Sequence, residues 1–264
     1  MVAPGIALVC LDFDGTVVIY EDSRTFFHAA AIQALNRLED SGVRWCTNSG
    51  RDDRNQVEIL ENSRARGLRH MPEALLCSES FIFIAGADDY VSLESWNHSA
   101  QKRLGHFHRH VQAVLRHRLD DWDARYHPQT YIGPQYTVFR VEDVNAQTGC
   151  FHAELCVALS GIAHARVSRN GSWLSVLPEH LGKGNVLRNY LRVTRTQPER
   201  VLAIGDHLND LGMLDGSAAE LVGCPANAVP EVMRAVAGAG GFVAGREGAE
   251  GTADVIGHFM GWGA

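Results

Sequence analysis

One apolar segment that ends in two closely spaced carboxylates constrains this sequence more than any other feature. Residues 6–11 (IALVCL) are apolar at every position, which is typical of a strand buried on both faces of a parallel sheet. Asp12 and Asp14 follow directly, within the run D-F-D-G-T. Ligands of open parallel sheets bind at the carboxyl ends of the strands, so we expect both carboxylates to line a crevice there. The alternative is a solvated, Asp-rich turn.

Helix and strand patterns alternate on both sides of a different middle segment. Such alternation predicts an α/β fold, a Rossmann-like core whose parallel sheet has helices on both faces. The predicted helices are Thr25–Glu39, Arg51–Arg66, Gly184–Arg192 and one that starts at Leu208, and the predicted strands are Val43–Thr47, Ala74–Cys77, Arg200–Ile204 and Ala219–Val222.

In the middle segment the predicted strands are more polar, and a basic, His-rich helical stretch, Ser99–Leu119, lies among them. We interpret residues 85–175 as an inserted α+β cap domain, and residues 1–84 and 176–264 as the catalytic core. The connections near residues 80–86 and 176–182 contain Gly or Pro, and a few such residues can absorb a hinge motion. We therefore expect a mobile lid, with a rigidly docked domain as the alternative. The predicted strands of the insert are Tyr136–Val141, Glu154–Leu159, Ala165–Ser168 and Ser172–Val176.

Three further motifs carry chemistry. Asp206 and Asp210 follow a second apolar strand, and carboxylates at two strand ends predict a site for a hard cation such as Mg²⁺. A plain helix N-cap is the alternative for Asp206 or Asn209. The T-N-S-G-R run of residues 47–51 predicts an anion cradle at a helix N-terminus, or simply a cap. Lys183 between two glycines can neutralise phosphoryl charge, although alone it would read as an exposed turn lysine.

In this order the four motifs resemble the haloacid dehalogenase superfamily of phosphatases, in the branch of Cof-like and sucrose-phosphate phosphatases with a large type C2 cap. The resemblance covers the core at both ends of the chain. The run S-W-L-S-V-L-P of residues 172–178 and the run G-C-P-A-N-A of residues 223–228 are also similar to that branch.

The resemblance implies a role for each matching residue. Asp12 is the expected nucleophile, and Asp14 the expected general acid and base. Asp12, the backbone carbonyl of Asp14, and Asp206 are expected to hold Mg²⁺, with Asp210 supporting that shell. The residues expected to bind phosphate are Ser49, Lys183 and Asn209, with Thr47 as an open alternative to Ser49.

The expected function is magnesium-dependent hydrolysis of a phosphomonoester, with a sugar phosphate as the best guess at the substrate. A phosphomutase is one alternative, but the resembling mutases have a longer, glycine-containing segment between the Gly-Asp and the Asn-Asp of the last motif. Only His207 and Leu208 separate those pairs here. A non-catalytic binding module is another alternative, and it usually lacks one of the carboxylates that this chain keeps.

Composition narrows the possible partners. The net charge is −7, which argues against a general nucleic-acid binder, and no apolar run reaches the roughly 18 residues of a membrane span. The six cysteines form no C-x-x-C pair and fit a reducing, cytoplasmic location. His106 and His110, spaced as zinc ligands can be, lack an acidic or Cys partner at matching spacing. We interpret this His-rich stretch as a solvated, partly cationic cap surface that faces a phosphorylated substrate. Trp173 is expected to pack where the insert rejoins the core, or to stack on a sugar.

Overall fold

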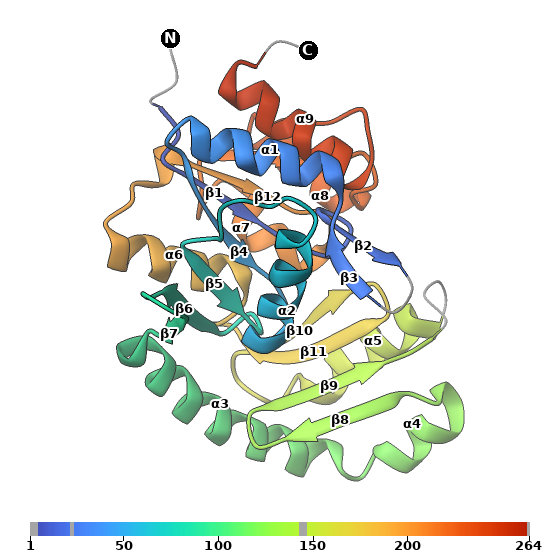
Figure 1. The fold of residues 1–264 in the computed structure, drawn as a ribbon. Coiled ribbons are helices and arrows are strands. Elements are labelled where there is room, and N and C mark those ends of the chain that lie inside the picture. Colours follow the sequence, from blue (N-terminus) through green and yellow to red (C-terminus); the bar gives the residue numbers. More distant parts are fainter. Residues whose placement is uncertain (1–4, 22–23, 143–146, 263–264) are drawn as a thin grey trace. The chain divides into compact units, whose positions relative to one another are not determined.

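A computed structural model describes residues 5–21, 24–142 and 147–262. The described chain divides into two compact units (Figure 1). Unit 1 comprises residues 1–93 and 183–264, and unit 2 comprises residues 94–182. The insert predicted at residues 85–175 therefore begins and ends earlier in the sequence than unit 2. Residues 85–93 fall in unit 1 because two strands, β6 (Phe81–Ala85) and β7 (Tyr90–Ser92), extend its sheet.

A mixed sheet in the order β14-β13-β12-β1-β4-β5-β6-β7 forms the centre of unit 1. The pairs from β14 to β5 are parallel, and β6 and β7 add antiparallel pairs at one edge. Strand β1 is buried at every position, as its apolar sequence predicts. The α/β core with a parallel sheet is thus confirmed. The remaining strands are β1 (Leu8–Leu11), β4 (Arg44–Asn48), β5 (Ala74–Cys77), β12 (Val201–Ile204), β13 (Leu221–Cys224) and β14 (Phe242–Val243).

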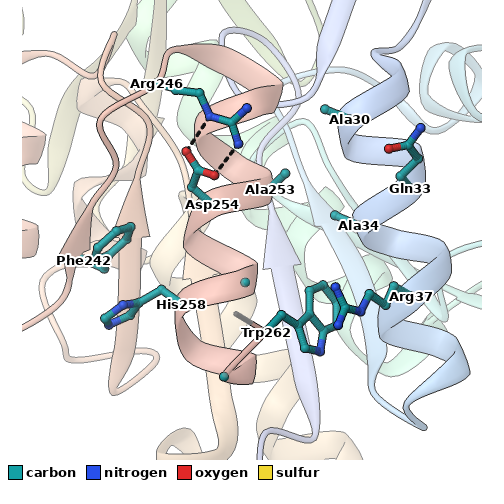
Figure 2. Close-up of a pocket in the computed structure, with 12 residues that line it drawn as sticks. Ala30, Gln33, Ala34, Arg37, Phe242, Arg246, Ala253, Asp254, His258 and Trp262 are labelled. Atoms are coloured by element: carbon teal, nitrogen blue, oxygen red, sulfur yellow. Dashed lines mark hydrogen bonds and ion pairs between the residues drawn. The ribbon is translucent and has the colours of Figure 1, made fainter. Parts of the chain in front are cut away.

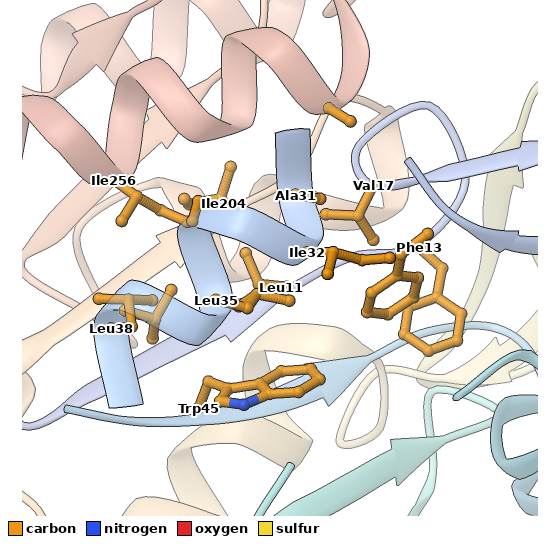
Figure 3. Packing of buried hydrophobic residues seen from close by; sticks show 14 of the residues in the cluster. Leu11, Phe13, Val17, Ala31, Ile32, Leu35, Leu38, Trp45, Ile204 and Ile256 are labelled. Carbon is orange, nitrogen blue, oxygen red and sulfur yellow. The ribbon is translucent and has the colours of Figure 1, made fainter. Parts of the chain in front are cut away.

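Helices cover both faces of this sheet. Helices α1 (Ala29–Asp40), α2 (Asp53–Arg64) and α9 (Gly248–Met260) bury residues with Leu11 and Trp45 in one hydrophobic cluster (Figure 3). The opposite face carries Asn48, whose side chain contacts α6 (Lys183–Thr194) and α7 (Leu211–Leu214). The other helical segments of unit 1 are η1 (Pro198–Arg200), η2 (Leu208–Asp210) and α8 (Pro230–Gly238).

A short hairpin corrects the first predicted helix. Strands β2 (Val18–Glu21) and β3 (Arg24–Phe27) pair antiparallel, and α1 begins only at Ala29. His28 is the N-cap of α1, and its Nδ1 accepts a hydrogen bond from the backbone N–H of Ala30 at 3.2 Å. Both phenylalanines of β3, Phe26 and Phe27, are buried.

Unit 2 is a sheet in the order β10-β11-β9-β8, with all pairs antiparallel and helices packed on it. The strand predicted at residues 154–159 is wrong. Those residues lie in helix α5, whose buried Phe151, Leu155 and Leu159 recur at the helical spacing of four. The elements are α3 (Glu94–Leu115), α4 (Leu119–Tyr126), β8 (Gln129–Gly133), β9 (Tyr136–Arg140), α5 (Gln147–Leu159), β10 (Ala165–Asn170) and β11 (Trp173–Pro178).

Aromatic side chains form the centre of unit 2. Trp122 meets Phe151 edge-to-face with ring centroids 5.2 Å apart, and Phe139 meets Phe151 at 5.3 Å. Such pairs add stability beyond their buried area. Trp173, by contrast, is 42% exposed and lies beside Tyr131 on the sheet. Within the described residues, no helix has the length and apolarity that crossing a bilayer requires.

Candidate active site

The candidate active site lies at the carboxyl ends of neighbouring strands in unit 1. In β1, Leu11 is in register with Ile204 of β12 on one side and with Thr47 of β4 on the other. The residues that follow these strands therefore emerge along one edge of the sheet. This register brings Asp12, Ser49 and Asp206 to the same edge, as the motif positions predict.

Lys183 is the centre of a buried charge cluster. Its Nζ lies 2.5 Å from Asp12 Oδ1 and 2.6 Å from Asp210 Oδ1, and all three side chains are fully buried. The side-chain amide of Asn48 donates to the backbone carbonyl of Lys183 at 3.0 Å, which fixes the start of α6. The lysine is thus a buried ion-pair partner, and the reading as an exposed turn lysine is wrong.

A glycine explains how α6 starts so close to α7. A Cβ on Gly184 would lie 1.9 Å from the backbone carbonyl oxygen of Gly212. Only a residue without a side chain can occupy that position while the two backbones stay in place. The second glycine of the G-K-G motif therefore brings the helix start, and with it Lys183, against the acidic residues.

Three carboxylates converge beside the lysine. Oxygen atoms of Asp12, Asp206 and Asp210 lie within 4.8 Å of one another. Asp210 Oδ2 accepts hydrogen bonds from the backbone N–H groups of Asp206 at 3.0 Å and His207 at 2.9 Å. Thr16 Oγ1 donates to Asp206 Oδ1 at 3.1 Å. These bonds hold the acidic loop in one conformation without using the oxygen atoms of Asp12.

The donor set fits a hard divalent cation. Asp12 Oδ2 is buried and has no hydrogen-bond partner among the described residues, and such an orphan atom is costly unless something else binds it. Three carboxylates against one lysine leave excess negative charge in a buried place. Carboxylate oxygens are the ligands that Mg²⁺ prefers, so Asp12, Asp206 and Asp210 are suitable ligands for that ion.

The titration behaviour of the cluster reflects the same excess charge. Burial, and then the neighbouring Asp210, raise the pKa of Asp12 well above its ordinary value. The same two causes raise the pKa of Asp206 to about 7. Burial alone would lower the pKa of Lys183, but the charges of Asp12 and Asp210 outweigh it, so the lysine stays protonated. A bound cation would stabilise both carboxylates in their charged form.

Asp14 has different partners. Arg51 donates two hydrogen bonds to the carboxylate of Asp14, from Nε to Oδ2 at 2.9 Å and from Nη2 to Oδ1 at 2.6 Å. The hydroxyl of Tyr20 also donates to Asp14 Oδ1. Burial would raise the pKa of Asp14, but the hydrogen bond and charge of Arg51 outweigh it and lower the pKa. The carboxylate of Asp14 is therefore held in place and ionised, outside the group of three.

The two candidate phosphate hydroxyls differ in their partners. Thr47 Oγ1 donates to Gln56 Oε1 at 2.6 Å, inside strand β4 and fully buried. Ser49 lies just beyond the strand, and its Oγ accepts a bond from the backbone N–H of Arg51 at 3.3 Å. No described residue accepts the proton of the serine hydroxyl, whereas the threonine proton is bound by Gln56.

Asn209 lies in the same acidic loop. Its side-chain amide donates to Glu79 Oε1 at 3.3 Å, and its Oδ1 is buried without a partner among the described residues. Glu79 follows strand β5 with a left-handed φ of 53°, an unusual backbone conformation for a residue other than glycine. The loop after a fourth strand, β5, therefore also contributes a residue to the edge of the site.

Several residues of the site were missed at the sequence level. Thr16 and Asn48 lie inside the D-F-D-G-T and T-N-S-G-R motifs but were given no role. Tyr20 and Glu79 lie in no motif, and no local pattern distinguishes them from ordinary polar residues. Asn227 lies in the late turn that carries part of the family resemblance. Its amide donates to the backbone carbonyl of Gly15 at 2.9 Å and reaches Asp206 Oδ2 at 3.5 Å.

Gly15 is required by both conformation and space. Its φ is +75°, and a Cβ there would lie 2.2 Å from Asp206 Oδ2. The turn that carries Asp14 away from Asp12 thus passes directly over the carboxylate of the second acidic motif. The glycine of D-F-D-G-T is the residue that allows the two acidic loops to meet.

A groove between α1 and α9 is separate from this site. It has a volume of about 990 Å³, and Figure 2 shows Arg37 over the ring of Trp262 and the ion pair of Arg246 with Asp254. None of the predicted site residues lines it. We therefore assign the chemistry to the strand ends and not to this groove.

Comparison with known proteins agrees with the fold and the motifs. Residues 108–238 match the family model described as haloacid dehalogenase-like hydrolase. None of the curated proteins compared with the chain matches it. Among solved structures, the chain is similar to a sucrose-phosphatase from Synechocystis sp. PCC6803 in complex with sucrose and phosphate, with a TM-score of 0.70, 18% identity, and coverage of 97% of this chain and 98% of that chain.

Two further solved structures have the same fold. One is a protein from Thermoplasma acidophilum, with a TM-score of 0.61, 16% identity, and coverage of 97% of this chain and 99% of that chain. The other is a subclass IIB sugar phosphatase of the same superfamily, with a TM-score of 0.60, 15% identity, and coverage of 96% of this chain and 98% of that chain. These matches confirm the predicted fold class, and the family model confirms the resemblance to the haloacid dehalogenase superfamily.

Proposed function

Because this chain is a haloacid dehalogenase-like hydrolase, we propose that it hydrolyses phosphate monoesters with Mg²⁺, through an aspartyl-phosphate on Asp12. One observation carries the proposal: Asp12 has one oxygen on Lys183, while its other oxygen is buried and has no hydrogen-bond partner among the described residues. Asp206 and Asp210 lie beside this carboxylate. Asp12, Asp206, Asp210 and the backbone carbonyl of Asp14 would hold the metal. The ion would supply positive charge where two anions must approach each other.

Asp12 attacks in the first step. One of its carboxylate oxygens forms a bond to phosphorus, and the bond from phosphorus to the ester oxygen breaks. Lys183 and the hydroxyl of Ser49 bind the phosphoryl oxygens, and the charge of the lysine offsets the negative charge that has to be brought together. We choose Ser49 over Thr47 because the threonine proton is already used by Gln56.

Asp14 moves the protons. In the first step it protonates the leaving alkoxide, and in the second it takes a proton from the water that attacks the aspartyl-phosphate. Inorganic phosphate leaves and Asp12 is restored. The Arg51 contact keeps Asp14 ionised in the free enzyme, which suits the second step. A bound phosphate anion nearby raises the pKa of Asp14 and so favours the protonated form that the first step needs.

Unit 2 carries features that support a sugar phosphate as the substrate. On its sheet, Tyr131 and Trp173 lie with ring centroids 5.6 Å apart, and the Arg140 guanidinium lies 5.5 Å from the Trp173 ring. Both aromatic side chains are 42% exposed. Exposed rings beside a cation suit a ligand with apolar faces and polar edges, such as a sugar. We propose that unit 2 acts as the cap that reads the leaving group, as a mobile lid.

A turnover assay tests the proposal. Wild type should release phosphate from an aryl phosphate or a sugar phosphate with Mg²⁺, and EDTA should abolish the release. Asp12→Asn should lose several orders of magnitude in rate, as removal of a nucleophile does. Asp88→Asn, an exposed aspartate of unit 1, is the matched control and should keep full activity.

The same assay exposes competing functions. Robust turnover by Asp12→Asn, or turnover in EDTA, would overturn the mechanism. Conversion of a hexose 1-phosphate to an isomeric phosphate, with a bisphosphate activator and without free phosphate, would show a phosphomutase. A folded sample that stays inactive across a panel of esters would point to a binding module.

The six free cysteines fit the proposed reducing, cytoplasmic location.

A further inference from the structure

Unit 2 contains a cavity of its own, built from three segments. Its volume is about 720 Å³, within the range of small-molecule sites. Helix α3 forms one wall, the turn of residues 161–164 forms another, and Pro178 at the end of β11 with His180 forms the third. The apolar lining comes from Phe107 and Ile162, which are half-buried, and from Pro178, which is buried. None of the residues assigned to the candidate active site lines this cavity.

Basic side chains gather around that apolar lining. Lys102, Arg103, His106, His110, His164 and His180 line the cavity, and no acidic residue is among its lining residues. The charges of Arg103 and His164, after the larger effect of burial, lower the pKa of His180. Side chains from α3, from the turn of residues 161–164 and from the segment after Pro178 therefore act on the same space.

Some of these cations have no partner within the described part of the chain. Lys102 and Arg103 make neither a hydrogen bond nor an ion pair with any described residue, while His164 Nδ1 lies 3.0 Å from Glu179 Oε2. Among the described residues, no carboxylate neutralises the positive charges of Lys102 and Arg103 on α3. In a chain with a net charge of −7, such a local reversal of charge favours an anionic ligand.

We propose that this cavity binds a small organic phosphate with an apolar body, at a site distinct from the candidate active site. Phe107, Ile162 and Pro178 contact the body, and Arg103 with Lys102 and the histidines holds the phosphate group. A guanidinium can bind two phosphate oxygens at once, which makes Arg103 the central residue of the site. The inference does not depend on the proposed hydrolysis.

A non-hydrolysable probe tests this site. Binding of naphthylphosphonate to the full chain is measured by calorimetry in EDTA, so that no metal recruits it to the strand ends. Arg103→Gln should weaken binding about tenfold, the usual effect of losing a charged hydrogen bond. Arg109→Gln, an exposed arginine of the same helix outside the cavity, should bind as wild type does, and so should Ser49→Ala.

Two further probes separate the parts of the ligand. Methylphosphonate has the charge without the apolar body, and naphthalene methanol has the body without the charge, so both should bind far more weakly than naphthylphosphonate. Equal weakening by Arg103→Gln and Arg109→Gln would overturn the proposal. Loss of binding in Ser49→Ala, or no binding to wild type, would also overturn it. Circular dichroism and thermal melting of each variant show whether it is folded.

Discussion

Lys183 Nζ lies 2.5 Å from Asp12 Oδ1, although the two residues are 171 positions apart in the sequence. Both side chains are fully buried, and Asp210 completes the ion-paired group. An ion pair in such a place is costly to break, because removing one partner leaves an uncompensated buried charge. A change at Lys183 should therefore affect both the stability of the chain and its turnover.

Lys183→Met should destabilise the chain by about 3–5 kcal/mol and abolish turnover. Added Mg²⁺ should recover part of the stability, because the cation would neutralise the carboxylates that the lysine no longer contacts. Chemical denaturation with and without Mg²⁺ measures both effects. Lys102→Met, at an exposed lysine, is the control and should change the free energy of unfolding little. Equal stability of the two variants would contradict the account of the charge cluster.

The Arg51 contact predicts a shift in the pH profile of turnover. Arg51 lowers the pKa of Asp14, so Arg51→Gln should raise it. The base step follows release of the alcohol, so it is seen in kcat. Because that step needs ionised Asp14, the acidic limb of kcat, measured where dephosphorylation limits turnover, should move to higher pH in the variant. Arg54→Gln, an exposed arginine of α2 without such a contact, should leave the limb in place. An unmoved limb in Arg51→Gln would show that Asp14 is not the group that titrates.

Two glycines with the same backbone angle allow strain to be separated from site geometry. Gly15 and Gly42 both have a φ of +75°, but a Cβ meets Asp206 only at Gly15, and open space at Gly42. Gly42→Ala should cost about 1–2 kcal/mol of stability and leave activity unchanged. Gly15→Ala should lose activity by far more than its change in stability explains. Full activity of Gly15→Ala would refute the close approach of the two acidic loops.

His108 predicts a pH-dependent stability of unit 2. It is fully buried beside Thr137 Oγ1 at 3.1 Å, and burial lowers its pKa to about 4. The unfolded chain binds a proton near pH 6.5 while the folded chain does not, so stability is present above pH 6.5 and falls as the pH drops towards 4. The loss should be at most about 3 kcal/mol.

His108→Leu removes this titration. The free energy of unfolding of wild type minus that of the variant, measured from pH 7 to pH 4, should become steadily lower as the pH falls. Exposed His110→Leu, on the same helix, should follow the wild-type curve. Parallel curves for wild type and His108→Leu would contradict the buried, neutral state of this histidine.

The sequence was most informative where one short segment carries both the structure and the chemistry. Strand β1 with Asp12 and Asp14, and the loop with Asp206 and Asp210, could be predicted because strand, turn and carboxylates are contiguous. Tyr20 and Glu79 could not, because they reach the site only after a hairpin and a left-handed turn have formed.

Unit 2 shows the other limit of sequence reasoning. Residues 154–159 are predicted as one of the more polar strand patterns of the insert. In the structure, Leu155 and Leu159 face the core of unit 2 while Val157 is 69% exposed, so helical spacing governs burial. Trp173 was expected to pack at the junction with the core, and the strand register instead places it on an exposed sheet surface beside Tyr131.

Trapping of the phosphoryl group tests the central claim most directly. The chain is incubated with a phosphate monoester labelled on phosphorus and Mg²⁺, quenched in acid, digested and mapped by mass spectrometry. The account predicts a hydroxylamine-sensitive phosphoryl group on Asp12 that is absent without Mg²⁺ and absent in Asp12→Asn. Turnover of the labelled ester with the label on another residue, or with no covalent label at any time, would contradict it.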